Sequence, residues 1–416
     1  MNFLKNLSSY FIANIFSKIM GFLLFMYVSS ILSPRDFGLL AIVKSLISNS
    51  SSFVFLGLGT VILTHYIHEK NKEKLLIDIN NIFFRSFATF TIIITAAFFL
   101  IDFSNKTENF FHSLISLSFV LSSVFLAFYT DISINLLRIE NRISSMIRIS
   151  ILSTILNTFL VIILLHFFKS FFVLLIGSLL VYLMYFFYLI KNYPFIFKFR
   201  SENIFQSHIL KVSIPSMLSS IFTSLLLTTD KYMLANFINI ETVGIYEVSL
   251  RFGSLYDTGI AVVFTTIYMP WLINKMKNNF VKFFRVNLMV AFLNLLIPVF
   301  IIFIPDSFWQ LFELLIGKDF HTSIIYIKFS IINFVLFHSI TMLNIVFLFL
   351  KNSRIMATTI FLMLTTNCFL NVFLIPRYEI FGAIASSYTC IIAAIFILAG
   401  IQLANREKYQ ELAKNL

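Results

Sequence analysis

The chain has few charged residues, and this shortage limits what kind of protein it is. Asp, Glu, Lys and Arg make up 12% of its 416 residues, against about 25% in a soluble globular protein. Hydrophobic residues make up 59%, and the mean hydropathy is +0.92. The apolar excess runs along the whole length, so a large soluble domain is excluded. The composition predicts a polytopic membrane protein.

Motifs of common enzyme classes are also missing. The sequence has no Gly-x-Ser-x-Gly, no Cys-x-x-Cys, no phosphate loop and no His-Glu-x-x-His, each of which supplies a catalytic, redox, phosphate or metal site. The two cysteines, Cys368 and Cys390, lie inside apolar runs and are interpreted as small buried hydrophobic residues. We therefore expect no catalytic residue, no metal site and no cofactor.

Apolar runs fill most of the chain. A helix of about 20 residues crosses the hydrocarbon core of a bilayer, and the runs predict an all-α fold of about 12 transmembrane helices. A basic, aromatic stretch at 191–211 divides them into two six-helix lobes, 1–190 and 212–416, with 191–211 as a cytoplasmic linker. The predicted spans are about 10–32, 37–60, 82–101, 110–137, 149–165, 171–190, 212–238, 243–268, 286–304, 324–349, 355–375 and 381–403.

Basic residues between these spans are unevenly distributed. Of 31 Lys and Arg residues, 21 fall on one side of the membrane, six on the other and four within spans. Cytoplasmic loops carry an excess of Lys and Arg, so both termini are expected in the cytoplasm. The net charge of +12 is explained by this loop pattern, and no nucleic-acid partner is expected.

Four cations fall inside predicted spans: Lys18, Lys44, Lys231 and Arg251. A charge near the bilayer centre costs roughly 3 kcal/mol or more, and such charges usually face a water-accessible cavity lined by protein. Asn14 shares a helical face with Lys18, and Asn49 shares a polar stripe with Lys44. The predicted substrate-binding set, a cationic cavity, is Lys18, Lys44, Arg251, Lys231, Asn14 and Asn49.

Each feature also has a structural interpretation. Stripes of Ser, Thr and Gly are typical of helix-packing seams. Lys44 and the two later cations lie near enough to span ends for their side chains to reach the interface. Arg251 stands four residues after Glu247, so the two can form an ion pair. Lys231 follows Asp230 and can pair with neighbours in the same way.

Intramembrane carboxylates are candidates for ion coupling. Asp257 is predicted near mid-membrane, where it suits a proton or sodium site or the counter-charge of Lys18. Glu247 and Asp230 complete the set of candidate proton- or sodium-coupling residues. Two glycines at matching places in the halves, Gly38 and Gly244, are 206 residues apart and indicate an internal repeat.

Several short segments resemble one transporter family. The run Ile31-Leu32-Ser33-Pro34-Arg35-Asp36-Phe37-Gly38 follows a span with Asn14 and Lys18, and this pattern resembles the Wzx-type flippases of the multidrug/oligosaccharidyl-lipid/polysaccharide (MOP) exporter superfamily. The layout is similar over nearly the whole chain. Other segments that resemble the family are Asp230-Lys231, Val243-Gly244-Ile245-Tyr246, Arg138-Ile139-Glu140-Asn141-Arg142 and Phe381-Gly382-Ala383.

This resemblance implies a two-lobed transporter with a cavity between its lobes. Its expected substrate is an undecaprenyl-pyrophosphate-linked oligosaccharide, turned by alternating access to the outer leaflet of a bacterial inner membrane in O-antigen or other polysaccharide biosynthesis. Membrane lipids, a polysaccharide polymerase and a chain-length regulator are its implied partners. A related lipid II flippase has cations in its first, second and eighth spans, and Lys18, Lys44 and Arg251 occupy those spans here.

Two other functions stay open from the sequence. A small-molecule exporter of the same superfamily would share the fold, although an exporter of cationic drugs would favour an acidic cavity. A membrane-embedded polysaccharide polymerase or glycosyltransferase would act on the same lipid-linked sugars. The longest predicted outward loop, 305–323, is short for such an enzyme.

Overall fold

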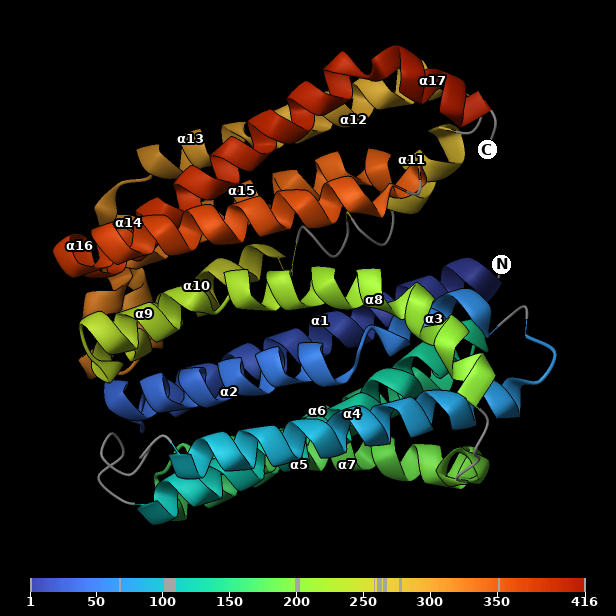
Figure 1. Cartoon of the computed structure of the whole chain (residues 1–416). Helices are drawn as coiled ribbons and strands as arrows, with labels where there is room; N and C mark the ends of the chain where they lie inside the picture. The colour runs from blue at the N-terminus through green and yellow to red at the C-terminus, as the bar shows by residue number, and fades with distance from the viewer. Residues whose placement is uncertain are drawn as a thin grey trace. The chain divides into compact units, whose positions relative to one another are not determined.

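The computed structural model describes residues 2–66, 69–100, 110–198, 203–257, 259, 264, 268–276, 279–350 and 352–414. Every regular element within these ranges is helical, as the sequence predicts (Figure 1). In this described part, eight helices are long and apolar enough to cross a membrane. The count of twelve spans stays a prediction.

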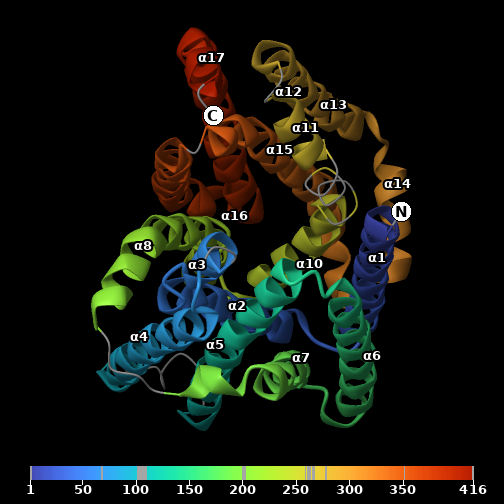
Figure 2. The same ribbon diagram turned by 90° about the vertical axis from the view of Figure 1, so that its right-hand side faces the viewer.

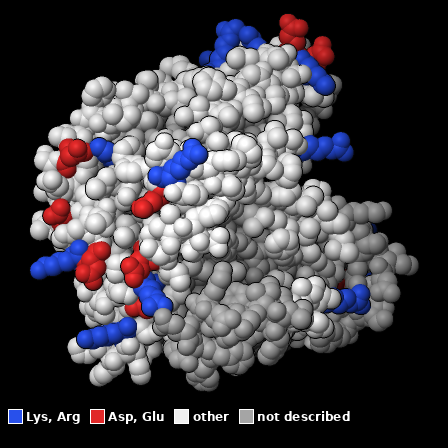
Figure 3. All heavy atoms as spheres, turned by 60° about the vertical axis from the view of Figure 1, so that its left-hand side comes forward, with Lys and Arg blue, Asp and Glu red and all other residues white. Residues whose placement is uncertain are grey.

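The surface has the composition expected of helices that face lipid. Large apolar side chains are exposed along the long helices; Phe300 is 70% exposed and Phe303 is 80% exposed. On the face in Figure 3, charged side chains are sparse, and broad uncharged surface separates them. In water such large apolar patches would be unusual, but hydrocarbon solvates them without cost.

Contacts divide the chain into two compact units, which we call unit 1 and unit 2. Unit 1 comprises residues 1–25 and 42–224, and unit 2 comprises residues 26–41 and 225–416. These units group residues by contact, whereas the predicted lobes, 1–190 and 212–416, group membrane spans. The predicted lobes therefore stay a prediction.

Unit 1 is held together by stacked aromatic rings and buried amides. Phe83 stacks on Phe128 with ring centroids 3.6 Å apart. The Tyr129 hydroxyl donates to Asn80 Oδ1 at 2.9 Å, and Asn80 Nδ2 donates to the carbonyl of Ile196 at 3.0 Å. The elements of unit 1 are most of α1 (Asn2–Ser29) and α2 (Pro34–Val54), then α3 (Leu58–His65), α4 (Lys72–Leu100), α5 (Phe110–Ile139), α6 (Ile143–Phe168), α7 (Phe172–Asn192), the 3₁₀ helix η2 (Pro194–Phe197) and all but the last residues of α8 (Asn203–Leu226).

The first part of the predicted linker is anchored to unit 1. Tyr193 donates to Glu140 Oε2 at 2.7 Å, and Tyr66 donates to Glu140 Oε1 at 2.9 Å. Burial and the bond to Glu140 raise the pKa of the Tyr193 phenol, so the hydroxyl stays a donor. Ile196 is fully buried. Residues 193–198 are therefore a fixed part of the unit.

In unit 2, α15 contacts α10, α12 and α16 (Figure 2). The chain turns sharply within α16 at Glu379, where φ is 51° and two helices meet; this residue lies between the spans predicted at 355–375 and 381–403. The elements of unit 2 are α9 (Thr229–Phe237), α10 (Ile240–Tyr256), α11 (Met269–Met276), α12 (Phe280–Asn294), α13 (Leu296–Phe303), α14 (Asp306–Gln310), the 3₁₀ helices η5 (Leu311–Leu315) and η6 (Lys318–Ser323), α15 (Ile324–Phe349), α16 (Ser353–Ala404) and α17 (Arg406–Lys414).

Residues 26–41, which we call the 26–41 segment, join unit 2 although they come early in the chain. A Cβ on Gly38 would collide with the carbonyl oxygen of Ile240, and a Cβ on Gly244 would collide with that of Pro34. Each carbonyl belongs to the residue four positions before the partner glycine. The contact is thus reciprocal, as expected for two related turns of an internal repeat.

Local sequence fixes both helix starts at this contact. Before α2, Ser33 Oγ accepts from the backbone N–H of Asp36 and donates to its carboxylate, which caps the first turn of the helix. Asn239 Oδ1 accepts from the backbone N–H of Thr242 at 2.8 Å, which caps α10. Because both starts are fixed, the two glycines meet in a defined register.

Replacing Gly244 with alanine is expected to destabilise the protein by roughly 1–3 kcal/mol, because the new methyl group overpacks a backbone contact. Thermal unfolding of the purified protein in detergent measures this. Gly400→Ala is the matched control, since nothing lies within 4 Å of the added Cβ and alanine favours a helix over glycine. A Gly244→Ala midpoint equal to that of the control would contradict the close approach.

Candidate functional site

A break in the chain positions the first residues of the site. The span predicted at 212–238 is two helices: α8 ends at Leu226 and α9 begins at Thr229. Asp230 and Lys231 therefore lie in the first turn of α9. The polar residues between Ser216 and Lys231 therefore do not lie along one continuous helix, because the helix restarts within this run.

One carboxylate pairs with two cations in unit 2. Glu247 Oε2 lies 2.8 Å from Lys231 Nζ, and Glu247 Oε1 lies 3.0 Å from an Arg251 guanidinium nitrogen. The side chains of Lys231, Arg251 and Glu247 are 15%, 42% and 9% exposed. The expected pairing of Arg251 with Glu247 is present, while Lys231 pairs with Glu247 and not with the adjacent Asp230.

Asp230 is buried among hydrogen-bond donors. Its Oδ1 accepts from Asn371 Nδ2 at 2.7 Å, and its Oδ2 accepts from Ser387 Oγ at 3.0 Å and the Tyr246 hydroxyl at 3.2 Å. Asn371 Nδ2 also donates to Asn367 Oδ1 at 3.0 Å. A buried carboxylate needs such bonds because it has lost its water. Asn371 Oδ1 is itself buried and without a hydrogen-bond partner.

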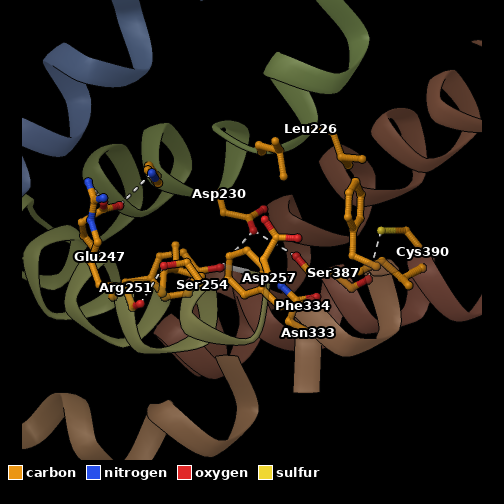
Figure 4. Close-up of a pocket in the computed structure, with 16 residues that line it drawn as sticks. Leu226, Asp230, Glu247, Arg251, Ser254, Asp257, Asn333, Phe334, Ser387 and Cys390 are labelled. Carbon is orange, nitrogen blue, oxygen red and sulfur yellow. Dashed lines mark hydrogen bonds and ion pairs between the residues drawn. The ribbon is translucent and has the colours of Figure 1, made fainter. Parts of the chain in front are cut away.

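These groups line a cavity of about 360 Å³ in unit 2. In Figure 4, Glu247 and Arg251 lie at one side, Ser387 and Cys390 at the other, and Asp230 between them. Two cations and three carboxylates face it, so its charge is mixed. The full lining is Leu226, Leu227, Asp230, Lys231, Tyr246, Glu247, Leu250, Arg251, Ser254, Asp257, Asn333, Phe334, Phe337, Ser387, Cys390 and Ile391.

Asp257 lines this cavity at the end of α10 and is exposed. The helical backbone widens here, since residues 257, 259, 264 and 268 are π-helical. Widened turns of this kind are frequent at functional sites.

The predicted residues of the first half lie in unit 1 and are not part of this lining. Lys18 is exposed on α1, and Lys44 is half-buried on α2. Asn49 Oδ1 accepts from Ser224 Oγ of α8 at 2.6 Å, so this asparagine takes part in a helix-packing seam. The side chain of Asn14 falls outside the described part of the structure.

Sequence reasoning missed the partners of Asp230. Asn367 and Asn371 are four residues apart in an apolar run, so they share a helical face. Buried amides in a membrane span need hydrogen-bond partners, so the Asn367–Asn371 pair could have indicated a buried polar site. Tyr246 and Ser387 gave no such signal. Within the described ranges, no three His, Cys, Asp or Glu side chains gather to hold a metal ion.

Comparisons with known proteins agree with this fold. The profile of the family described as polysaccharide biosynthesis protein matches residues 3–276. The structure is similar to lipid II flippase MurJ in an inward closed conformation, with a TM-score of 0.68 and 16% identity over 98% of this chain and 90% of that one. No curated protein sequence matches the chain.

Two further solved structures have the same fold. One is an inward-facing multidrug resistance MATE family transporter of the MOP superfamily, with a TM-score of 0.65 and 13% identity over 96% of each chain. The other is a MOP superfamily transporter from Pyrococcus furiosus, with a TM-score of 0.57 and 13% identity over 98% of this chain and 96% of that one. At these identities the similarity establishes the fold alone, a helical, multi-pass membrane fold like that of these three structures.

Proposed function

The chain belongs to the polysaccharide biosynthesis protein family, and from this premise we propose that it is a flippase for an undecaprenyl-pyrophosphate-linked oligosaccharide. The substrate moves from the cytoplasmic to the periplasmic leaflet of a bacterial inner membrane by alternating access. The product supplies O-antigen or another polysaccharide, lipopolysaccharide included. Both chain termini are cytoplasmic in this proposal, in keeping with the distribution of basic loops.

The observation that carries the proposal is the pair of cations on the cavity wall. A pyrophosphate headgroup cannot cross hydrocarbon without compensation for its charge. Lys231 and Arg251 face the cavity from α9 and α10, and they supply charges that bind phosphate oxygens. Lys18 and Lys44 are the proposed phosphate-binding cations of unit 1.

The remaining lining suits a sugar attached to a lipid. Asn333 and Ser254 offer hydrogen bonds for hydroxyl groups, and Phe334 and Phe337 offer aromatic faces. A cavity that combines apolar walls with a few polar groups is the usual form of a small-ligand site. Asn14 and Asn49 are the proposed polar contacts in unit 1.

We propose that a proton or a sodium ion drives the cycle at Asp230. Its carboxylate, the orphaned Asn371 Oδ1 and the Ser387 hydroxyl gather oxygen atoms in one buried place. Oxygen ligands suit hard cations, and an ionisable group at membrane depth is a natural proton site. Asp257 and Glu247 are the other proposed coupling residues, since both line the same cavity.

An exporter of small cationic molecules is the second candidate. The observation in its favour is the three carboxylates of the cavity, Asp230, Glu247 and Asp257. We propose that the protein transports the oligosaccharide and does not polymerise it. Its proposed partners are a polysaccharide polymerase, a chain-length regulator and membrane lipids.

Deleting the gene tests this function. An impermeant enzyme that modifies the sugar is added to intact spheroplasts of the deletion strain, and the lipid-linked oligosaccharide is then extracted to measure the modified fraction, which lay in the outer leaflet. We expect complete repeat units to be trapped on the cytoplasmic face and released when the gene is restored. Single units that reach the outer face without forming chains would indicate a polymerase, and unchanged lipid-linked sugars would indicate the small-molecule exporter.

A further inference from the structure

Glu247 holds both cations of the cavity at once. Each of its carboxylate oxygens contacts a different cation, Lys231 Nζ at 2.8 Å and Arg251 at 3.0 Å. The three charged groups line a cavity large enough for a small ligand, and Figure 4 shows the Glu247–Arg251 pair at its edge. The carboxylate therefore occupies the position in which a substrate phosphate would be bound.

We propose that Glu247 is a placeholder anion, whose carboxylate occupies Lys231 and Arg251 in the empty protein and is displaced by a phosphate group of the substrate. This inference rests on the proposed function and adds a residue that controls access to its phosphate site. A carboxylate and a phosphate present similar oxygens to a cation. The two anions consequently compete for one pair of cations.

The charge balance explains why a placeholder is useful. Two uncompensated cations at membrane depth would be costly, and leaving a buried charge without its partner is strongly destabilising. Glu247 reduces that cost while the cavity is empty. A pyrophosphate ester carries more negative charge than one carboxylate, so it wins the competition when it reaches the cations.

The same competition assists release. After the headgroup has been carried across, the Glu247 carboxylate returns to Lys231 and Arg251 and displaces the phosphate. Arg251 is 42% exposed, so its guanidinium has room to change partner. A protein without the placeholder is expected to bind the headgroup more tightly and to release it more slowly.

Equilibrium binding of inorganic pyrophosphate to the purified protein, measured by isothermal titration calorimetry, tests the proposal. Glu247→Gln keeps the size of the side chain and removes its charge. We expect this variant to bind pyrophosphate at least about tenfold more tightly, because the Glu247 carboxylate no longer competes for the cations and no longer repels the phosphate at close range. The double variant Glu247→Gln with Arg251→Gln should lose that gain in affinity, because the phosphate can no longer bind the Arg251 guanidinium.

Glu241→Gln is the matched control, since it removes one carboxylate from the same helix. Glu241 is exposed and is not part of the cavity lining, so pyrophosphate affinity should change by less than about threefold. An equal gain in both variants would show that only the overall charge of the protein matters, and this would overturn the placeholder role.

Weaker or unchanged binding in Glu247→Gln would also overturn it, because Glu247 would then be a clamp that holds the cations in place. If that happens while the deletion strain still traps lipid-linked oligosaccharide, the proposed function stands and only the placeholder falls. If pyrophosphate binds to neither protein and the deletion traps nothing, both proposals fall.

Discussion

Arg251→Gln is expected to slow flipping of the lipid-linked oligosaccharide by about tenfold, because Arg251 is 42% exposed and water screens part of its attraction for the headgroup. The substitution removes one of the two cations that face the cavity and leaves Glu247 paired with Lys231 alone. The headgroup then gains only one cation when it displaces Glu247, instead of two. Its charge is less well compensated, which raises the barrier to its passage.

The rate is measured as the appearance of substrate in the outer leaflet of proteoliposomes. Arg251→Lys retains the charge but not the planar fork of the guanidinium, so it should recover part of the rate. Arg354→Gln is the control for lost charge elsewhere, because Arg354 is exposed at the start of α16 and is not part of the cavity. Flipping at the wild-type rate in Arg251→Gln would remove Arg251 from the proposed path.

Asp230→Asn is expected to uncouple transport from its driving ion and to reduce stability. Three donors converge on the carboxylate of Asp230. An asparagine keeps one acceptor oxygen and turns an N–H₂ group toward donors, and an unsatisfied buried group costs about 1–3 kcal/mol. The thermal midpoint should therefore fall, and the flipping rate should no longer respond to an imposed ion gradient.

Sodium titration separates the two ions. A ligand that binds only the folded protein raises its unfolding temperature, so sodium should stabilise the wild type but not Asp230→Asn if it binds there. With a proton as the driving ion, sodium changes neither midpoint, and only a pH gradient affects transport. Tyr246→Phe is the control for a lost hydrogen bond, since it removes one donor to Asp230 and keeps the carboxylate. A gradient response retained in Asp230→Asn would exclude Asp230 as the coupling residue.

Hydropathy and charge predicted the fold class because lipid imposes a simple rule on sequence. A helix that satisfies its own backbone groups must be apolar over its length, and that requirement is visible without a structure. The break at Glu379 could also be predicted from the sequence, because polar residues separate two apolar runs there. The helical fold needed no knowledge of which helices touch.

The site could be predicted only in part from the sequence, because it depends on which helices touch. Glu247 and Arg251 share one helix at a spacing of four, so their pairing follows from helical geometry. Lys231 joins them from α9 only because the chain breaks between Leu226 and Thr229. The polar run Thr228-Thr229-Asp230 suits a helix start there, but it suits a polar stripe on one long helix equally well. The bonds from Asn371 and Ser387 to Asp230 cross between distant helices, which no local pattern encodes.

The 26–41 segment has a consequence for how the protein is made. Gly38 leaves the ribosome 206 residues before Gly244, and synthesis proceeds at about 5–20 residues per second. For roughly 10–40 seconds Gly38 therefore waits for the Ile240 backbone that it packs against, and Phe37 waits longer for the ring of Phe320. Residues 42–224, the larger part of unit 1, are translated during this interval. Unit 2 can close only afterwards, around the oldest part of the chain.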